Sequence, residues 1–267
     1  MMALMLKIQS LGYRTDLFLR GFEGEILERQ AYTVVRTPNN PTFRWGNFLL
    51  FNTAPTRADL GPWLAAFALE YPNSRHVAIG WDDPQNAGDS SAFLEAGFRL
   101  DVSVVMLAKA VHAPPKINTA CQIRVFEATD WQAWIDLECA ADAALPEAER
   151  EGAGYREFIT CKSAEYEQMG AAGHGDFWGA FLDGQLVASL GLYFWQGVGR
   201  FQRVSTHPDF RRRGLCSTLV HHVAKLGLER VETVVMVADP EYVAAGIYES
   251  VGFEPSEEQF GLEKIVR

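Results

Sequence analysis

A basic loop that contains a glycine is the part of the sequence best suited to chemistry. The run from Val204 to Leu219 reads VSTHPDFRRRGLCSTL. It opens with strand-forming side chains, and the strand ends at Pro208 because proline has no N–H to extend a ladder. After Gly214 the apolar residues recur at helical spacing. The order of strand, short basic loop and helix start is the one that an anion-binding site requires.

Backbone and side chains of this loop would act on an anion together. The first N–H groups of a helix have no partner within it, and here they face back over Arg211, Arg212 and Arg213. Arginine adds planar, charge-assisted hydrogen bonds to phosphate oxygens. Gly214 lets the backbone approach a ligand closely. We therefore expect a phosphate here; the alternative is a solvated surface, where arginines beside a glycine are common.

A second segment, further along the chain, carries a candidate acid. Residues 232–237 are rich in β-forming types, Asp239-Pro240 marks a helix start, and a helical stripe ends at Gly252-Phe253. The stripe consists of Ala244, Ile247, Tyr248 and Val251. The phenol of Tyr248 could donate a proton; the alternative is a buried aromatic residue whose hydroxyl is satisfied by the fold.

Both segments resemble motifs of the GNAT superfamily of acyl-CoA N-acyltransferases. The pyrophosphate loop of that family follows the fourth strand and reads Arg/Gln-x-x-Gly-x-Gly/Ala, and this chain has Arg211-x-x-Gly214-x-Cys216, with cysteine in place of the small residue. A tyrosine four residues before a Gly-Phe pair belongs to the family's second motif and falls at Tyr248. The resemblance implies that Tyr248 is the general acid, which protonates the thiolate released from the thioester.

The resemblance also implies a site for acyl-CoA, with acetyl-CoA as the expected co-substrate. In the family the fourth strand splays from the fifth and its backbone receives the pantetheine amides, while an N–H near Val204 polarises the acyl oxygen. An amine then attacks the thioester directly, so positioning and oxyanion stabilisation supply much of the rate. The predicted cofactor-binding residues are Val204, Ser205, Thr206, Arg211, Arg212, Arg213, Gly214, Leu215, Cys216 and Ser217.

The sequence indicates the general base and the acceptor only weakly. Many family members carry a carboxylate on the fourth strand, where this chain has Arg200-Phe201-Gln202-Arg203. Glu165, His174 and Asp176 are the remaining candidates, each of which also fits an ordinary surface residue. Seven acidic residues lie between 142 and 167. They would attract a cationic amine or a basic peptide N-terminus, or they form a solvated helix face.

Length and composition indicate two modest domains. The chain has 267 residues, of which 48% are hydrophobic, and Ala113-Pro114-Pro115-Lys116 interrupts two regions of mixed α and β character. We expect domains at 1–112 and 119–267 with a linker at 113–118. Residues 1–118 carry 11 basic and 11 acidic residues, whereas residues 119–267 carry 13 and 23. This acidic second half argues against a nucleic-acid partner.

The two halves resemble each other in outline. Ser91–Phe98 parallels Gly246–Phe253, and the strand and turn at 77–84 parallel those at 234–240. We infer a tandem duplication; the alternative is that strand, helix and Gly-Phe is a common way to end a helix.

The first copy lacks the residues that the chemistry needs. Phe93 stands where the second copy has its tyrosine, and residues 53–63 contain no Arg-x-x-Gly pattern before the helix. We expect the first copy not to bind CoA and to serve as a scaffold or as a wall of the substrate site.

The element order over residues 119–267 completes the prediction: strand, two helices, three antiparallel strands, helix, strand, helix and closing strands. This order resembles the layout of the GNAT superfamily, and the resemblance implies the fold class α/β, with tandem acyl-CoA N-acyltransferase folds and a mixed, mostly antiparallel sheet flanked by helices. We predict an N-acyltransferase that acetylates a primary amine. The alternatives are a CoA-binding regulator without turnover and an aminoacyl-tRNA-dependent transferase.

Several features predict the setting of the protein. No run approaches the roughly 18 apolar residues of a membrane helix, and the start is too short for a signal peptide. The four cysteines have neither disulfide-framework nor metal-binding spacing, and the adjacent His221 and His222 face different directions on a helix. We expect a cytoplasmic protein with no metal and no membrane partner, and a possible homodimer through an exposed strand edge.

Overall fold

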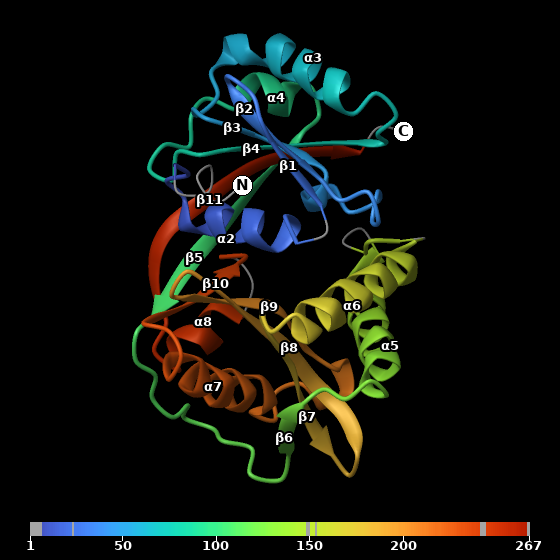
Figure 1. The fold of residues 1–267 in the computed structure, drawn as a ribbon, viewed down its shortest axis with the longest axis vertical. Helices are drawn as coiled ribbons and strands as arrows, with labels where there is room; N and C mark the ends of the chain where they lie inside the picture. The colour runs from blue at the N-terminus through green and yellow to red at the C-terminus, as the bar shows by residue number, and fades with distance from the viewer. Residues whose placement is uncertain (1–6, 23, 148–149, 153, 241–243, 266–267) are drawn as a thin grey trace. The chain divides into compact units, whose positions relative to one another are not determined.

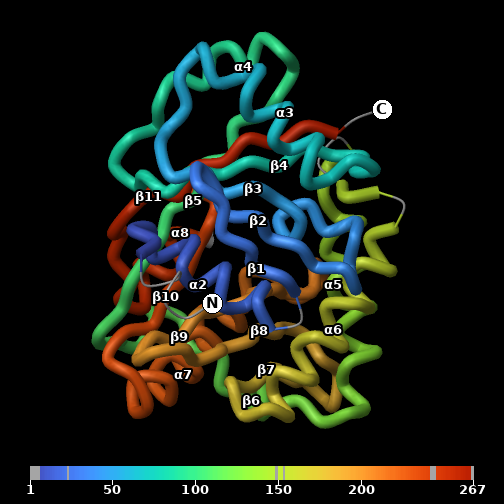
Figure 2. Tube along the Cα trace, turned by 45° about the horizontal axis from the view of Figure 1, so that its top comes forward, coloured from blue at the N-terminus to red at the C-terminus, as the bar shows by residue number. Residues whose placement is uncertain are grey.

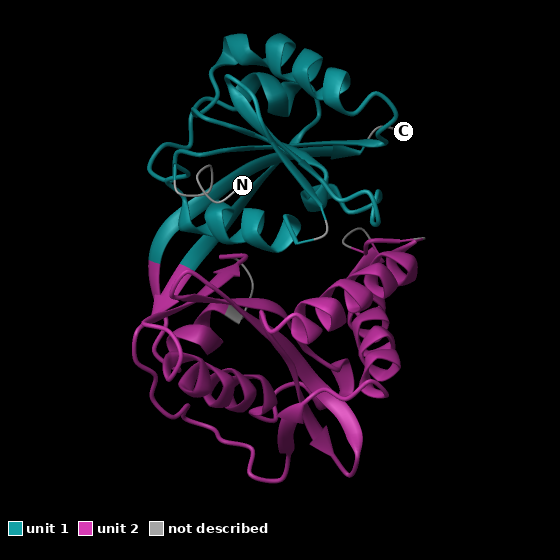
Figure 3. Cartoon of the chain, in the orientation of Figure 1, with its two compact units in different colours: residues 1–105, 256–267 teal, residues 106–255 magenta. Residues whose placement is uncertain are grey.

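A computed structural model describes residues 7–22, 24–147, 150–152, 154–240 and 244–265. The chain separates into two compact units (Figure 3). Residues 1–105 and 256–267 form unit 1, and residues 106–255 form unit 2. Each unit has a mixed sheet with helices on both faces, which is the predicted fold class.

Unit 1 is built on a sheet in the strand order β1-β2-β3-β4-β11-β5. Strands β3 and β4 are parallel, whereas β1 and β2, β2 and β3, and β4 and β11 pair antiparallel. Its elements are α2 (Leu11–Arg20), β1 (Glu25–Glu28), β2 (Tyr32–Arg36), β3 (Phe48–Phe51), α3 (Leu60–Glu70), β4 (His76–Trp81), α4 (Ser91–Glu95), β5 (Arg99–Ala108), which ends in unit 2, and most of β11 (Glu254–Ile265).

Alternation along β3 distributes its aromatic residues between two layers of helices. Phe48 and Phe51 point to opposite faces of the sheet because their positions differ by an odd number. The Phe51 ring stacks on Trp63 of α3 at 4.0 Å between centroids, and the Phe48 ring lies 6.0 Å from Tyr13 of α2. Helices α3 and α4 therefore cover one face and α2 the other (Figure 1).

The C-terminal strand completes unit 1. Gly261 of β11 lies opposite Gly80 of β4, and Leu262 lies opposite Ile79. Phe260 and Leu262 are buried in the core of this unit. The predicted domains at 1–112 and 119–267 differ from the compact units at this end of the chain. The predicted boundaries of the two duplicated segments stay a prediction.

Unit 2 has the strand order β5-β10-β9-β8-β7-β6. Strands β6 to β9 are successively antiparallel, and β9 and β10 are parallel. Its elements are β6 (Gln122–Val125), α5 (Asp130–Ala143), α6 (Tyr155–Ala171), β7 (Gly175–Leu182), β8 (Gln185–Trp195), β9 (Val198–Thr206), α7 (Leu215–Leu228), β10 (Thr233–Ala238) and α8 (Ala244–Glu249).

Adjacent residues of β7 anchor the helices on the two faces of this sheet. The centroid of the Phe177 ring lies 5.1 Å from that of Trp134 of α5, whereas the centroid of Trp178 lies 6.0 Å from that of His222 of α7. Helices α5 and α6 run side by side (Figure 2). The predicted hairpin between β7 and β8 is confirmed: Asp183 and Gly184 have φ values of 49° and 80°, as a two-residue turn of type I′ requires.

The same supersecondary unit occurs twice. In unit 1 the parallel strands β3 and β4 are joined through α3, and α4 follows; in unit 2 the parallel strands β9 and β10 are joined through α7, and α8 follows. Phe93 of α4 and Tyr248 of α8 are both buried. The predicted tandem organisation is therefore confirmed in the topology.

Candidate active site

The fourth strand of unit 2 contains a bulge where the site is expected. Ser205 lies opposite Ser189 of β8, whereas Gln202 lies opposite Gly191, so β9 holds one more residue than its partner. Arg203 takes up the extra length in the left-handed region, with φ of 50°, which costs a non-glycine residue about 1–2 kcal/mol. Val204, beside it, is half-buried.

Past its midpoint β9 leaves its parallel neighbour. Its register with β10 runs over Val198–Arg200, and within the described part of the chain it ends there. In the second half of β9, Ser205 and Thr206 thus pair only with β8 among the described strands, and Val204 lies at the bulge, between the paired positions. The resemblance to the GNAT superfamily implies such a divergence between the fourth and fifth strands, and the binding of pantetheine at this edge stays a prediction.

The loop after β9 alternates between extended and left-handed backbone. A short 3₁₀ turn at Pro208–Phe210 follows the strand, and Arg211 is extended. Arg212 and Gly214 have φ values of 61° and 76°. Because such alternation turns successive N–H groups toward one concave surface, it is typical of anion-binding loops.

The backbone donors of this loop are available to a ligand. Among the described residues, no hydrogen bond uses the N–H groups of Arg212 through Ser217, and Thr218 is the first to donate, to the Gly214 carbonyl at 3.1 Å. These groups lie at the positive end of α7. Leu215 buries its side chain, but its N–H belongs to this row. A phosphate would satisfy donors that the chain leaves open.

Two of the three arginines donate hydrogen bonds to nearby backbone carbonyls. Arg211 Nε donates to the Thr206 carbonyl at 3.4 Å, and Arg213 donates to the Asp209 carbonyl at 3.0 Å while its guanidinium lies 4.8 Å from the Phe210 ring centroid. All three arginines are exposed. The loop that carries the backbone donors therefore also carries three exposed positive charges.

Cys216 is a neutral packing residue beneath the loop. Burial raises the pKa of its thiol to about 12, although a hydrogen bond with Thr206 acts in the opposite direction. A thiol with this pKa is protonated at neutral pH and is neither a nucleophile nor a metal ligand. Its neighbour Ser217 donates to the Gly214 carbonyl at 3.2 Å. Cys216 therefore fills the place of the family's glycine or alanine without adding a charge.

Tyr248 lies on the β9 side of α8. Its side chain is 4% exposed, and its ring lies 6.2 Å from Phe253. The Phe253 ring lies 5.9 Å from Phe201 of β9. The predicted acid and the bulged strand therefore share one aromatic contact chain, and the role of Tyr248 stays a prediction.

A buried polar cluster that the sequence did not reveal adjoins the bulge. One Arg203 guanidinium nitrogen donates to Glu138 Oε2 and to the Tyr155 hydroxyl, each at 2.8 Å. Burial opposes the charge on Arg203, but Glu138 and Tyr155 raise its pKa above the usual value. Glu138 is 2% exposed, and its Oε1 has no hydrogen-bond partner in the described chain. This cluster places a buried carboxylate next to the strand that lacks one.

One signal in the sequence could have pointed to this carboxylate. Glu138 follows Trp134 by four residues on α5, so both lie on the helix face that packs on the sheet. A carboxylate at a core-facing position needs a partner in the fold. The identity of that partner, 65 residues further along the chain, was not readable.

The structure places the three predicted candidates for the base in different surroundings. Glu165 is buried in an ion pair with Lys162 on the same helix. His174 closes the turn between α6 and β7, where its N–H donates to the Met169 carbonyl at 3.0 Å. Asp176 is half-buried on β7. Of the acidic residues between 142 and 167, Glu149 lies outside the described residues.

The matching helix start in unit 1 already holds a carboxylate. Asp59 Oδ2 accepts hydrogen bonds from the Thr56 N–H at 2.8 Å and from the Thr56 hydroxyl at 2.6 Å, which forms a capping box. Unit 1 therefore has a negative charge where unit 2 has three arginines.

The described residues contain no group of three or more His, Cys, Asp or Glu side chains that could hold a metal ion. None of their helices combines the length and the apolar character that crossing a membrane demands.

Comparisons with known proteins agree with this geometry. Residues 136–253 match the model of the acetyltransferase (GNAT) family. Comparison with curated proteins gave no match. Among solved structures, a functionally unknown conserved protein from Staphylococcus epidermidis is similar with a TM-score of 0.73 at 14% identity, over 92% of this chain and 96% of that one.

Two further structures share the fold over nearly the whole chain. A GCN5-related N-acetyltransferase from Kribbella flavida has a TM-score of 0.62 at 13% identity, over 96% of both chains. A tandem GNAT protein from the clavulanic acid biosynthesis pathway has a TM-score of 0.54 at 14% identity, over 98% of this chain and 94% of that one. At these identities the similarity concerns the fold alone.

Proposed function

We propose that this protein transfers an acetyl group from acetyl-CoA to a primary amine, because residues 136–253 match the model of the acetyltransferase (GNAT) family. The observation that carries the proposal is the row of open backbone donors from Arg212 to Ser217, set at the start of α7 in a loop that also carries three exposed positive charges. A pyrophosphate presents oxygens on adjacent phosphorus atoms, and consecutive N–H groups are suited to receive them.

The chain's own residues would divide the work along β9 and α8. The loop holds the pyrophosphate, and the backbone of Val204 and Ser205, on the edge that has left β10, receives the pantetheine amides and polarises the acyl oxygen. The thioester supplies the activated acyl group. The amine nitrogen forms its bond to the acyl carbon as the carbon–sulfur bond breaks, and Tyr248 donates a proton to the departing sulfur. The proton that the amine nitrogen loses passes through water to the Tyr248 phenolate and restores the phenol.

The proposed acceptor is a small-molecule amine or a peptide amine, and neither nucleic acid nor a membrane takes part. The acidic character of residues 119–267 favours a cationic acceptor over a nucleic acid. We also propose a cytoplasmic setting, because none of the four cysteines is paired in the structure. A homodimer through a sheet edge stays a proposal without a specific contact to support it.

The proposed activity is tested by following free CoA thiol during incubation of the full chain with acetyl-CoA and a panel of amines. We expect turnover with at least one primary amine. Tyr248→Phe should lower kcat by about 10²- to 10⁴-fold, the range for a positioned general acid, while acetyl-CoA binding is retained. An unaltered kcat in this variant would remove Tyr248 from the mechanism.

One observation favours a second candidate, a CoA-binding regulator without turnover. Strand β9 presents Arg200, Gln202 and Arg203 where many relatives carry a carboxylate, and Glu138 is committed to Arg203. Tight acetyl-CoA binding combined with no turnover on any amine of the panel would favour the regulator.

A further inference from the structure

The segment between β5 and β6, residues 109–121, contains the predicted linker at 113–118 and lies along the elements of unit 2 that form the proposed site. It leaves β5 after Ala108 and runs as an extended coil past α7 to β6 (Figure 1). The His112 N–H donates to the Val251 carbonyl at the end of α8, at 3.2 Å. Residues 116–118, which we call the brace, then contact the start of α7. Both helices of the proposed site are thus touched by one segment.

Side chains of the brace donate hydrogen bonds to the backbone carbonyl groups of the loop. Lys116 Nζ donates to the Arg212 carbonyl at 2.8 Å, and Asn118 Nδ2 donates to the Arg213 carbonyl at 3.1 Å. The Asn118 N–H donates to Thr218 Oγ1 at 2.9 Å, and the same hydroxyl donates to the Gly214 carbonyl at 2.6 Å. Three successive loop carbonyls are therefore held, two by the brace and one by Thr218.

Because the peptide group is planar, hydrogen bonds to the loop carbonyls also fix the direction of the backbone N–H groups that follow them. The carbonyl of one residue and the N–H of the next share a plane and point in opposite directions. When the Arg212 and Arg213 carbonyls face the brace, the N–H groups of Arg213 and Gly214 face away from it. These are donors of the proposed phosphate site.

The fit between brace and loop is close. A Cβ at Gly214 would lie 2.8 Å from the Lys116 carbonyl oxygen, so only glycine admits the brace at this distance. Asn118 is itself fixed, because its Oδ1 accepts from the N–H groups of Ala120 at 3.0 Å and Cys121 at 3.1 Å. Arg212, a non-glycine residue in the left-handed region, depends on such external contacts to hold its conformation.

We propose that the brace, Lys116–Asn118, positions the phosphate-binding loop and thereby sets the affinity for acyl-CoA. Lys116 and Asn118 act through the backbone of Arg212 and Arg213, so they are positioning residues. The inference rests on the proposed function of the loop. It predicts that loss of a brace contact weakens binding of acyl-CoA and leaves the chemical step at saturation unchanged.

The test uses the full chain and three variants, Asn118→Ala, Lys116→Ala and Thr218→Val. Each removes brace or loop-carbonyl contacts without removing a proposed ligand. We expect the Kd for acetyl-CoA, measured by calorimetry, and the KM for acetyl-CoA to rise by about three- to tenfold, the effect of one or two hydrogen bonds, while kcat stays within about twofold. A general loss of structure would instead lower the thermal midpoint and kcat together.

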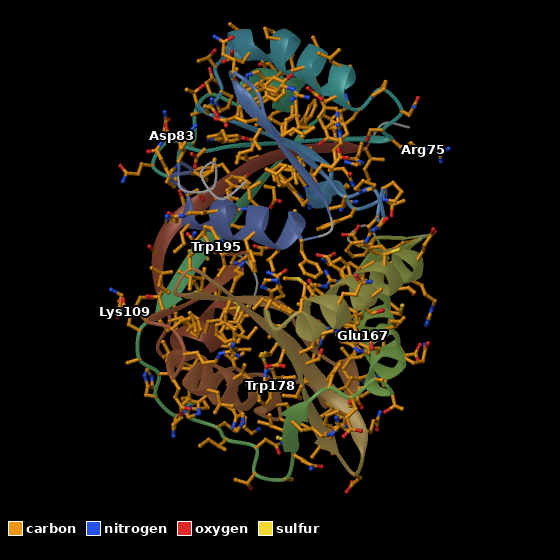
Figure 4. All side chains as sticks on the ribbon, in the orientation of Figure 1. Arg75, Asp83, Lys109, Glu167, Trp178 and Trp195 are labelled. Carbon is orange, nitrogen blue, oxygen red and sulfur yellow. The ribbon has the colours of Figure 1, made fainter. Side chains whose placement is uncertain are left out.

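Matched controls are available in the same chain. Lys109→Ala removes an exposed lysine just after β5, before the brace (Figure 4). Thr160→Val removes a hydroxyl that bonds the carbonyl four residues earlier on α6, at 2.8 Å, as Thr218 does on α7. Both should bind acetyl-CoA as the parent protein does.

The outcomes separate the two proposals. Parent protein that binds acetyl-CoA, together with brace variants that bind equally well, would overturn the positioning role and leave the proposed function standing. Parent protein that fails to bind acetyl-CoA would overturn the proposed function and this inference with it. Weaker binding in the brace variants alone, with the controls unchanged, supports both.

Discussion

Individual residues of the loop decide its chemistry through conformation more than through charge. Arg212 and Gly214 adopt left-handed backbone, and a Cβ at Gly214 would collide with the Lys116 carbonyl oxygen. Gly214→Ala would therefore move the row of donors before it altered any charge. Cys216 acts through the volume of its side chain and contributes no charge.

Cys216 should behave as an unreactive thiol. Burial raises its pKa to about 12, so the thiol form is retained in the folded state well above the usual cysteine pKa of about 8.5. Its contribution to stability is thus fully present below pH ~8.5 and declines as the pH rises toward 12, because the unfolded chain ionises first. Alkylation of the native protein at pH 8 should modify Cys216 more slowly than the same thiol in denatured protein.

A variant of Cys216 tests whether this thiol takes part in acyl transfer. Cys216→Ala should leave the pH profile of acyl transfer unchanged. A profile that loses an ionisation in this variant, or equal alkylation rates in native and denatured protein, would show that Cys216 is reactive.

At the scale of elements, one polar cluster joins the bulge in β9 to the helices α5 and α6. The guanidinium of Arg203 reaches Glu138 on α5 and Tyr155 on α6 from the bulged position. The pairing with β10 ends at Arg200, just before the bulge. The divergence of β9 from β10 near Val204 thus coincides with an ion pair from β9 to α5.

Substitution of Arg203 can separate conformation from charge. Arg203→Gly and Arg203→Ala both remove the ionic partner of Glu138 and leave it only the Tyr155 hydroxyl as a donor, which costs about 1–3 kcal/mol of unfolding free energy. Glycine accommodates the left-handed backbone, whereas alanine retains a penalty of about 1 kcal/mol. We therefore expect the glycine variant to be the more stable of the two in urea unfolding, the reverse of the usual order in a strand. The usual order, with alanine more stable, would show that the bulge relaxes when the ion pair is lost.

At the scale of the whole molecule, the closing strand ties the C-terminal residues to the first unit. Leu262 is buried opposite Ile79, while Ile265 on the same strand is 63% exposed. Leu262→Ala should lower the free energy of unfolding by roughly 2–5 kcal/mol, the range for a core leucine. Ile265→Ala should change it by less than about 0.5 kcal/mol. Equal effects, measured by urea unfolding, would mean that β11 does not belong to the core of unit 1.

Local features of the sequence predicted most of the elements. The helical stripe after Gly214, the Asp183-Gly184 turn and the strand before Pro208 depend on spacing and backbone preference within a few residues, and the structure confirms them. The tandem topology also follows, because the second unit repeats the order of the first.

Contacts between residues that are far apart in the sequence could not be predicted from the sequence. The pairing of Arg203 with Glu138 joins residues 65 positions apart, and the brace at 116–118 contacts a loop nearly 100 positions away. The sequence showed the brace only as a proline-rich interruption. The closing strand read as part of the second half because strand pairing has no local signature.

The central claim is that the start of α7 binds acyl-CoA, and calorimetry with acetyl-CoA tests it most directly. The parent chain should bind, and a variant with Arg211→Ala and Arg213→Ala should bind at least about tenfold more weakly. Each arginine supplies charge in the loop that carries the donors, and each donates to a backbone carbonyl, that of Thr206 at the end of β9 or that of Asp209. Arg230→Ala, near the far end of α7, is the matched control and should bind as the parent does. No binding to the parent chain, or equal binding to the double variant, would contradict the account.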